Sequence, residues 1–372
     1  MGERLLLAIE SSCDESAVAL VRGGREVLAE RVASQTAIHA QFGGVIPEVA
    51  ARAHHEWLPR LLSEVLREAE GLGIAGEIEG LALTTGPGLV GSLLVGVGVG
   101  SAWAWAKGLP VLPVNHLEGH LRAAWLLDGK PLPAPTLPAI GLVVSGGHTL
   151  LVRVAGDGAI ERLGGTIDDA AGEAFDKIAR LLGAPYPGGA ALSALAAQLP
   201  RGANLQSLPI AKTERPYDFS FSGVKTAAIR QALVASGLAD HSPGRAATLT
   251  KQFSDHPLPR EAAVLIAAAT ERAIVGALRA GVQRALREHP DCSLIVGGGV
   301  AANGPLRAAL EEVAQVEGRS LVIPPLRWCT DNAAMIGAAG DALLREHRGA
   351  YQEPSSGVAV HAQWRIGSAV PA

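Results

Sequence analysis

The chain has 372 residues, of which 48% are hydrophobic and 45 are glycine, so it is globular and long enough for two packed lobes. Only 4% of the residues are aromatic and the net charge is -4, which argues against nucleic-acid binding by base stacking or bulk electrostatics. Three scattered cysteines without a CxxC pair exclude a disulfide framework and a zinc ribbon, and they suit a reducing compartment.

The first predicted element is a hairpin. Apolar runs at 5–10 and 17–21 flank a polar turn, the pattern of two strands joined by a loop. A helix expected to begin at Pro59 follows, because apolar residues recur on one helical face at Leu58, Leu61, Leu62, Val65 and Leu66.

An uncharged stretch at 81–106 is long enough to cross a membrane. However, the sequence TTGPG at 84–88 would break a spanning helix near its start. The small residues that follow favour a buried helix at about 89–107, packed closely against a sheet. We therefore expect no contact with a membrane.

The second half of the chain repeats the plan of the first. Runs at 140–144 and 150–154 flank the sequence SGGH and predict a second hairpin. A strand, a glycine loop and a helix follow the first hairpin from residue 78 and the second from residue 293. The repeat predicts a duplicated α/β domain with ligands at the carboxyl ends of the strands.

Further elements complete the chain. We expect a long helix at 262–286, a surface loop at 241–259 and a lobe boundary near 110–115. The last helix, from about Asn332, is expected to fold back on the first lobe.

The candidate metal ligands are two histidines in the sequence HLEGH. His116 and His120 lie four residues apart, so on a helix both rings can reach one ion, although a hydrogen-bonded surface pair has the same spacing. Glu118 is in the wrong position for the zinc-protease sequence HExxH. Asp331 is a candidate third ligand or, alternatively, a carboxylate at a helix N-terminus. Two histidines and a carboxylate suit Fe²⁺ first and Zn²⁺ second.

Several weaker motifs have two interpretations each. The residues at 145–149 offer backbone N–H groups to a phosphate or a carbonyl oxygen, or form a plain hairpin turn. The glycines at 188–189 and 297–299 suit a nucleotide but are not specific. Asp176 and Lys177 fit a salt-bridged helix face. Lys225 could contact a phosphate or end a strand, and the pair at 54–55 is interpreted as structural.

The motifs occur together in one order along the chain. They are IESSCDES, SQTAIHAQFGGVIPEVAARAH, TTGPGLVGSL, NHLEGH, VSGGHT, IDDAAGEAFDK, PYPGG, FSFSGVKT, VGGGVAAN and CTDNAAMI. From about Leu5 to Gly340, this order resembles the tRNA threonylcarbamoyladenosine transferase family, formerly described as O-sialoglycoprotein endopeptidases.

The resemblance implies a fold. The family has the duplicated ribonuclease H-like lobes of acetate and sugar kinases, heat-shock chaperones and actin, with the ligand site in the interlobe cleft. We accordingly expect a first lobe at 1–113 plus about 332–350, a second lobe at 114–331 that carries most metal and nucleotide contacts, and a tail at 351–372.

The resemblance also implies site residues. One divalent metal ion, Fe²⁺ or alternatively Zn²⁺, is expected on His116, His120 and Asp331. Asp14, Glu15 and His148 are the nearby candidates for catalysis, and the general base stays open. The adenylate of threonylcarbamate is expected at Val143, Val144, Ser145, Gly146, Gly147, His148, Asp176, Gly189 and Asn303.

The implied reaction transfers the threonylcarbamoyl group of threonylcarbamoyl-AMP to the exocyclic amine of the adenosine 3′ of the anticodon, in tRNAs that read ANN codons. The implied partners in bacteria are tRNA, a catalytically inert paralogue and a small P-loop ATPase, all in the cytoplasm. Two other functions stay open at this point: a metallopeptidase and an actin-like ATP-binding scaffold.

Overall fold

The computed structural model describes residues 3–127, 134–238 and 256–371. Two five-stranded sheets organise this part of the chain. The first sheet contains β1 (Leu5–Glu10), β2 (Glu15–Arg22), β3 (Glu26–Ser34), β4 (Ile78–Gly86) and β5 (Val111–Asn115). The second contains β6 (Ala139–Val144), β7 (Thr149–Val154), β8 (Ile160–Gly165), β9 (Ser293–Gly297) and β10 (Leu321–Val322).

The two sheets have the same topology. Their strand orders are β3-β2-β1-β4-β5 and, from the corresponding edge, β8-β7-β6-β9-β10. In each, the first three strands pair antiparallel and the last two join in parallel. The predicted duplication and fold class are therefore confirmed.

The first sheet buries both faces. Alternate residues of β1 point to opposite sides, so Leu7 and Ile9 pack under α2 (Pro47–Gly71) and α3 (Val90–Lys107). Leu6 and Ala8 pack instead against α11 (Ala333–Arg345). The short α1 (Thr36–Ala40) precedes α2.

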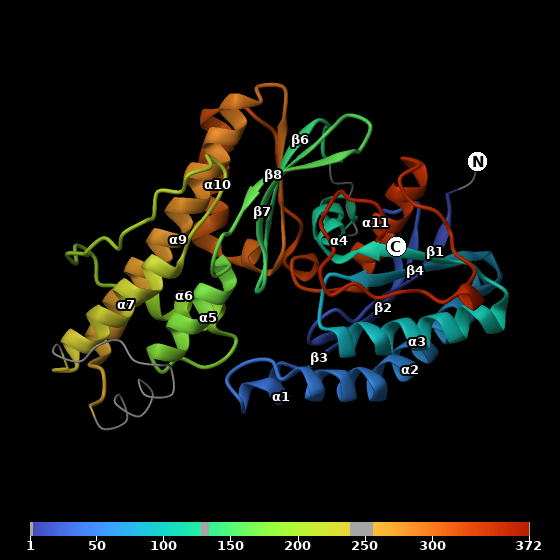
Figure 1. Cartoon of the computed structure of the whole chain (residues 1–372), viewed down its shortest axis with the longest axis horizontal. Helices are drawn as coiled ribbons and strands as arrows, with labels where there is room; N and C mark the ends of the chain where they lie inside the picture. The colour runs from blue at the N-terminus through green and yellow to red at the C-terminus, as the bar shows by residue number, and fades with distance from the viewer. Residues whose placement is uncertain (1–2, 128–133, 239–255, 372) are drawn as a thin grey trace.

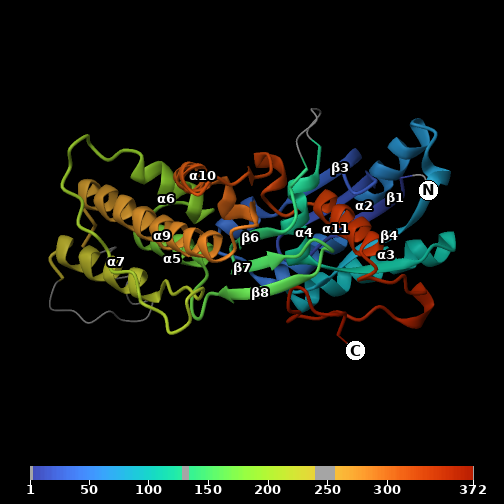
Figure 2. The ribbon, with the colours of Figure 1, turned by 90° about the horizontal axis from the view of Figure 1, so that it is seen from above.

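The second sheet is covered in the same way. Alternate residues of β6 pack against a helical layer, which contains α5 (Ala171–Leu181), α6 (Gly188–Ala196), α7 (Ser222–Ala235), α9 (Arg260–Glu288) and α10 (Gly304–Val316). Figure 2 shows this layer at one end of the molecule and α2 and α3 toward the other. The opposite face of the sheet packs against α4 (His116–Arg122).

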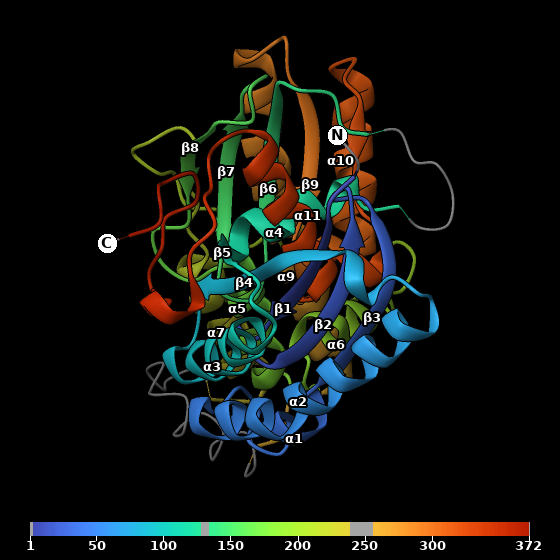
Figure 3. The ribbon, with the colours of Figure 1, turned by 90° about the vertical axis from the view of Figure 1, so that its right-hand side faces the viewer.

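Two helices therefore lie between the sheets. α4 packs against α11 (Figures 1 and 3). α11 packs on the first sheet, whereas α4 packs on the second sheet and also contacts β4 and β5 of the first. Gly119 makes the approach possible, because a Cβ there would lie 2.8 Å from Cδ1 of Ile336 on α11. The layers are thus helix, sheet, central helices, sheet and helix.

Most predicted elements are confirmed, including both hairpins and the helices after the two glycine loops. The predicted start of the second helix was wrong. α2 begins at Pro47, in the first turn where proline costs no hydrogen bond, and Pro59 lies inside it. Pro59 faces solvent, where water can satisfy the carbonyl group that proline leaves without a donor.

The uncharged stretch forms β4, a turn and α3. α3 packs closely against the sheet on one face, as predicted, since a Cβ at Gly100 would lie 2.9 Å from Cδ2 of Leu81. Its other face is exposed at Val90, Leu94 and Trp105. No helix in the described ranges is long and apolar enough to cross a membrane.

Two predictions concern other segments. Most of the loop predicted at 241–259 lies outside the described residues. The tail beyond Tyr351 lies along the first sheet, with hydrogen bonds from Gln352 N to Val111 O (2.7 Å) and from His361 N to Thr85 O (2.8 Å). The expected lobe boundaries stay predictions.

Candidate metal centre and ligand cleft

The sequence starts α4 directly after β5. Asn115 ends the strand, and its Oδ1 accepts a hydrogen bond from Leu117 N at 2.9 Å, which caps the helix. His116 and His120 then lie on one face, one turn apart, with ring centroids separated by 4.6 Å. Both side chains are buried.

Asp331 reaches these rings from the other central helix. It immediately precedes Asn332, whose Oδ1 caps α11 by accepting from Met335 N at 2.8 Å. Asp331 Oδ1 lies 3.1 Å from Nε2 of His120 and 3.6 Å from Nε2 of His116. One ligand atom from each residue falls within 4.8 Å of the others, so the predicted trio is brought together.

The chemistry of the trio fits a divalent metal ion. Both ring nitrogens of His120 are buried; Nε2 contacts Asp331 Oδ1 at 3.1 Å, and Nδ1 has no hydrogen-bond partner. A buried polar atom without a partner costs free energy, and a metal bond would remove that cost. Two imidazole nitrogens with one carboxylate are a donor set typical of zinc and non-haem iron.

A second carboxylate contacts the trio from the end of β1. Glu10 is buried, and its Oε2 lies 3.0 Å from Nδ1 of His116. Sequence reasoning missed Glu10, because nothing in its local pattern distinguishes it from a strand-end residue. The signal available was its place in the sequence IESSCDES.

The charges of the centre are strongly coupled. Burial alone would lower the pKa of His116, but the carboxylates of Glu10 and Asp331 outweigh it and raise this pKa to about 9. Burial would raise the pKa of Asp331, and the two histidine charges hold it well below its usual range. The centre therefore favours positive charge at the position between the carboxylates.

Two of the predicted catalytic residues follow β1. We call residues 11–14 the first turn. Asp14 accepts a hydrogen bond from Tyr186 Oη at 3.3 Å, and Glu15 accepts from Ser34 Oγ at 3.1 Å. Burial, together with the charges of Asp14 and Asp331, raises the pKa of Glu15 to about 10. The first turn thus adds acidic groups beside the metal trio.

The third predicted catalytic residue follows β6, in what we call the second turn, residues 145–148. The carbonyl of His148 accepts from Ser145 N at 2.8 Å and closes the turn. Burial, followed by the charges of His116 and His120, lowers the pKa of His148 to about 4. A neutral imidazole can accept a proton, so His148 has the state that a general base needs.

The glycines of the second turn are open. Gly146 and Gly147 are exposed, and no atom lies within 4 Å of a Cβ built at either position. By contrast, a Cβ at Gly298 would lie 2.3 Å from Val144 O, and its φ is +96°. The first pair leaves room for a ligand, whereas Gly298 is required by the fold. Val143 and Val144 are buried in β6.

Asp176 and Gly189 adjoin each other. Asp176 is half-buried on α5 and accepts a hydrogen bond from Gly189 N, at the start of α6, at 3.1 Å. Burial raises the pKa of Asp176. Only glycine fits at position 188, where a Cβ would lie 2.5 Å from Cα of Asp176.

Asn303 has a structural role that its motif did not indicate. Its Oδ1 caps α10 by accepting from Leu306 N at 2.8 Å. Its Nδ2 donates to Ser193 Oγ at 2.8 Å and to Glu271 Oε1 at 2.9 Å. These partners were missed because they come from α6 and α9, far away in the sequence.

The weaker motifs resolve as structural contacts. Lys177 pairs with Asp169 and Glu173, both at 2.7 Å, as a salt-bridged face. Lys225 also pairs with Asp169, at 2.5 Å, so this contact holds its amine. His54 is buried. Its Nδ1 contacts Ser16 Oγ at 2.7 Å, and its Nε2 contacts Cys13 O at 2.9 Å.

Glu118 points away from the metal trio, as its position predicted. It accepts hydrogen bonds from Arg348 at 2.8 Å and from Gly367 N at 3.2 Å. Asn115 Nδ2 donates to Trp364 O at 3.2 Å. The C-terminal segment, red in Figure 1, thus contacts α4 on the side opposite the metal trio.

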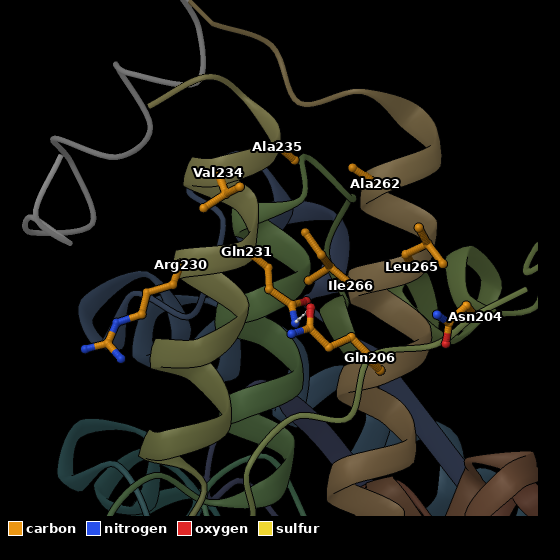
Figure 4. A pocket seen from close by; sticks show the side chains of 10 residues that line it. Asn204, Gln206, Arg230, Gln231, Val234, Ala235, Ala262, Leu265 and Ile266 are labelled. Carbon is orange, nitrogen blue, oxygen red and sulfur yellow. Dashed lines mark hydrogen bonds between the residues drawn. The ribbon is translucent and has the colours of Figure 1, made fainter. Parts of the chain in front are cut away.

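A groove of about 500 Å³ lies elsewhere, between α7 and α9 (Figure 4). Its walls include Val234 and Leu265, and Gln231 donates across it to Gln206 at 3.1 Å. None of the predicted site residues lines this groove. We assign it no part in the chemistry.

The model of the family described as tRNA N6-adenosine threonylcarbamoyltransferase matches residues 26–338. The chain belongs to this family. A member from Symbiobacterium thermophilum is 44% identical, and the alignment covers 93% of each chain. Members from Bacillus subtilis and Paracoccus denitrificans are 43% and 46% identical, covering 93% and 90% of this chain and 92% and 87% of theirs.

Solved structures of lower identity share the fold. HypF from T. kodakarensis has a TM-score of 0.55 at 13% identity, over 93% of this chain and 48% of that one. Full-length HypF in a phosphate- and nucleotide-bound form has a TM-score of 0.52 at 12% identity, over 91% and 46%.

Proposed function

We propose that this protein transfers the threonylcarbamoyl group from threonylcarbamoyl-AMP to the exocyclic amine of the adenosine 3′ of the anticodon, in tRNAs that read ANN codons. AMP is the leaving group. The observation that carries the proposal is the buried trio of His116, His120 and Asp331 beside the open glycines of the second turn, in a chain of the threonylcarbamoyltransferase family.

In this proposal the two central helices hold one divalent ion, Fe²⁺ or alternatively Zn²⁺, through the trio. When bound, such an ion supplies Lewis-acid polarisation of a carbonyl oxygen. The backbone N–H groups of Gly146 and Gly147 bind the phosphate of the adenylate. Val143, Val144 and Ser145 form the floor of that site. Asp176 accepts hydrogen bonds from the ribose hydroxyls, with Gly189 beside it, and Asn303 holds the start of α10.

The amine of adenosine attacks the carbonyl carbon, the bond from that carbon to the phosphate oxygen breaks, and AMP leaves with the electron pair. The amine must lose a proton. His148 is our first candidate for the base, since its lowered pKa keeps it neutral. Asp14 and Glu15 are the others, and Glu15 ranks last because its pKa, raised to about 10, keeps it protonated. No serine or cysteine nucleophile is required, so we expect no covalent enzyme intermediate.

The two other functions considered from the sequence are less well supported. A metallopeptidase of the HExxH type needs a carboxylate that activates water at the metal. Glu118 instead binds Arg348 and Gly367 N on the far side of α4. An ATP-binding scaffold gives no reason to bury two histidines against Asp331.

The mild negative charge of the chain fits an enzyme that binds tRNA with partner proteins. We propose a catalytically inert paralogue and a small P-loop ATPase as those partners, in the cytoplasm. The isolated chain should then bind tRNA more weakly than the assembled complex at physiological salt. Tight binding by the lone chain in a band-shift experiment would contradict this.

The test is mass spectrometry of nucleosides from total tRNA after depletion of the protein in its host. The strain is rescued with the wild type, with His116→Ala plus His120→Ala, or with His55→Ala as a matched control on an exposed histidine. We expect threonylcarbamoyladenosine to fall on depletion, and to return with the wild type and the control only.

Two results would count against the proposal. Full rescue by the double variant would remove the metal trio from the mechanism. A level of modified nucleoside that never falls on depletion would contradict the transferase role in the cell.

A further inference from the structure

Glu10 is a buried carboxylate at the end of β1, and both of its oxygens have polar partners. Its Oε2 accepts from Thr84 Oγ1 at 2.7 Å and contacts Nδ1 of His116 at 3.0 Å, and its Oε1 accepts from Ser12 N. Burying a carboxylate is unfavourable unless a positive charge and hydrogen bonds compensate for the lost hydration. Glu10 therefore has a partner of opposite charge or a function that justifies the burial.

The contact with His116 determines which ring nitrogen faces the metal trio. A carboxylate accepts but does not donate, so Nδ1 of His116 carries the proton in this contact. Nε2, which faces Asp331 Oδ1 at 3.6 Å, is then the nitrogen that would exchange its proton for the ion. Metal-bound histidines usually donate their other N–H to a carboxylate or carbonyl in this way.

The charges also match. Glu10, which is fully buried, and Asp331, whose side chain is 18% exposed, bring two carboxylates to the two histidines. A divalent cation between them gives a neutral centre, which a low-dielectric interior favours.

We infer that Glu10 is a positioning residue for the metal centre: it fixes the tautomer and orientation of His116 and balances the charge of the ion. The inference rests on the metal trio of the proposed function. It extends the centre to β1, so that a first-sheet strand holds a ligand on a central helix. The hydrogen bond from Ser12 N to Oε1 keeps the Glu10 carboxylate aimed at His116.

The test is calorimetric titration of the full-length apo-protein with zinc chloride, with chelator competition for tight binding. Glu10→Gln keeps an acceptor of the same shape but loses the charge, and Glu10→Ala removes both. Thr84→Val is the matched control, since it deletes another hydrogen bond to the same oxygen and leaves the charge. Thermal unfolding of each apo-variant reports on folding alone.

We expect Glu10→Gln to weaken zinc affinity by ~10–100-fold, Glu10→Ala to weaken it at least as much, and Thr84→Val to change it by less than ~3-fold. In long-range ¹⁵N–¹H spectra of the zinc-loaded wild type, His116 should be protonated at Nδ1. A ring protonated at Nε2 would overturn the inference.

Equal zinc affinity in Glu10→Gln and the wild type would also overturn it, even if the apo-variant melts at a lower temperature, because Glu10 would then only support the fold. Failure of the wild type to bind zinc or Fe²⁺ would instead show that the trio is not a metal site, and the inference about Glu10 would fall with it. Loss of tRNA modification is not used as a readout, so the inference and the transferase proposal can fail separately.

Discussion

The two sheets have one topology, but the turns after their first strands carry opposite chemistry. The first turn, after β1, leads from Glu10 to Asp14 and is followed by Glu15, so it concentrates carboxylates. The second turn, after β6, contains Gly146 and Gly147 and concentrates open backbone N–H groups. Equivalent positions of a duplicated fold have thus separated into a side that suits cations and a side that suits anions.

The metal trio lies where the two halves meet. His116 and His120 begin α4, which packs on the second sheet, and Asp331 precedes α11, which packs on the first. Because α4 and α11 pack on different sheets, the three ligands come together only through the contact between these two helices. This comparison leads to four predictions, from the largest expected effect to the smallest.

Removing a ligand should abolish transfer. Asp331→Ala is expected to reduce the rate of AMP release from threonylcarbamoyl-AMP with tRNA by more than ~100-fold, since even outer contacts of a metal site change function by ~10–100-fold. Chelation of the wild type should have the same effect and be reversed by Fe²⁺ or Zn²⁺. Activity that survives chelation would break the assignment of the metal trio.

Loss of a buried ion pair should lower the free energy of unfolding more than loss of an exposed pair. Glu118→Ala removes the 2.8 Å partner of Arg348 in a pair whose side chains are 3% and 18% exposed, while Glu346 stays at 3.1 Å, so we expect a loss of ~1–3 kcal/mol in urea unfolding. Glu56→Ala, in an exposed pair with Arg60, is the control and should cost less than ~1 kcal/mol. Equal effects would mean that Glu118 does not anchor α4.

Substitution of two glycines should have different effects, one on ligand binding at the second turn and one on the stability of the fold. Gly147→Ala is expected to raise the KM for threonylcarbamoyl-AMP ~10-fold at an unchanged melting temperature, because the added Cβ meets only the ligand's space. Gly298→Ala should instead cost ~1–3 kcal/mol of stability, because its φ of +96° is strained for alanine. An unaltered KM in Gly147→Ala would remove the phosphate site from this turn.

Glu30 on β3 should make the stability of the protein depend on pH. Burial raises the pKa of Glu30 from 4.5 to about 7, against the hydrogen bond from Ala334 N at 3.1 Å. The folded state therefore binds the proton more tightly than the unfolded state, and this stabilisation is lost as the pH rises from 4.5 through about 7.

Glu30→Gln removes the titration while keeping an acceptor for Ala334 N. We expect the variant to gain on the order of 3 kcal/mol relative to the wild type across this range, an upper value for a group that water partly reaches. Urea unfolding at several pH values measures the difference. A difference that does not vary with pH would show that Glu30 has the same pKa in the folded and unfolded states.

Much of the fold could be predicted because its signals are local. Apolar runs around a polar turn predict both hairpins. A spacing of four residues predicts that the two histidines of α4 lie on one face. The start of α2 was predicted wrongly, since a proline inside a helix and one at its first turn look alike in a sequence.

The rest depends on contacts between distant segments. Spacing alone could not join Asp331 to His120, and only the family resemblance indicated that pair. Glu10 was missed because its partner His116 lies on another element, and the hydrogen bonds of Asn303 were missed for the same reason. Tertiary packing, not local pattern, sets these positions.

The central claim is tested most directly by locating the metal ion in a crystal of the protein grown with Fe²⁺ or Zn²⁺. Anomalous diffraction recorded on either side of the metal's absorption edge identifies both its position and its element. We predict one peak at ~2.0–2.3 Å from a nitrogen of His116, a nitrogen of His120 and an oxygen of Asp331. A peak elsewhere, or none at this trio, would contradict the account.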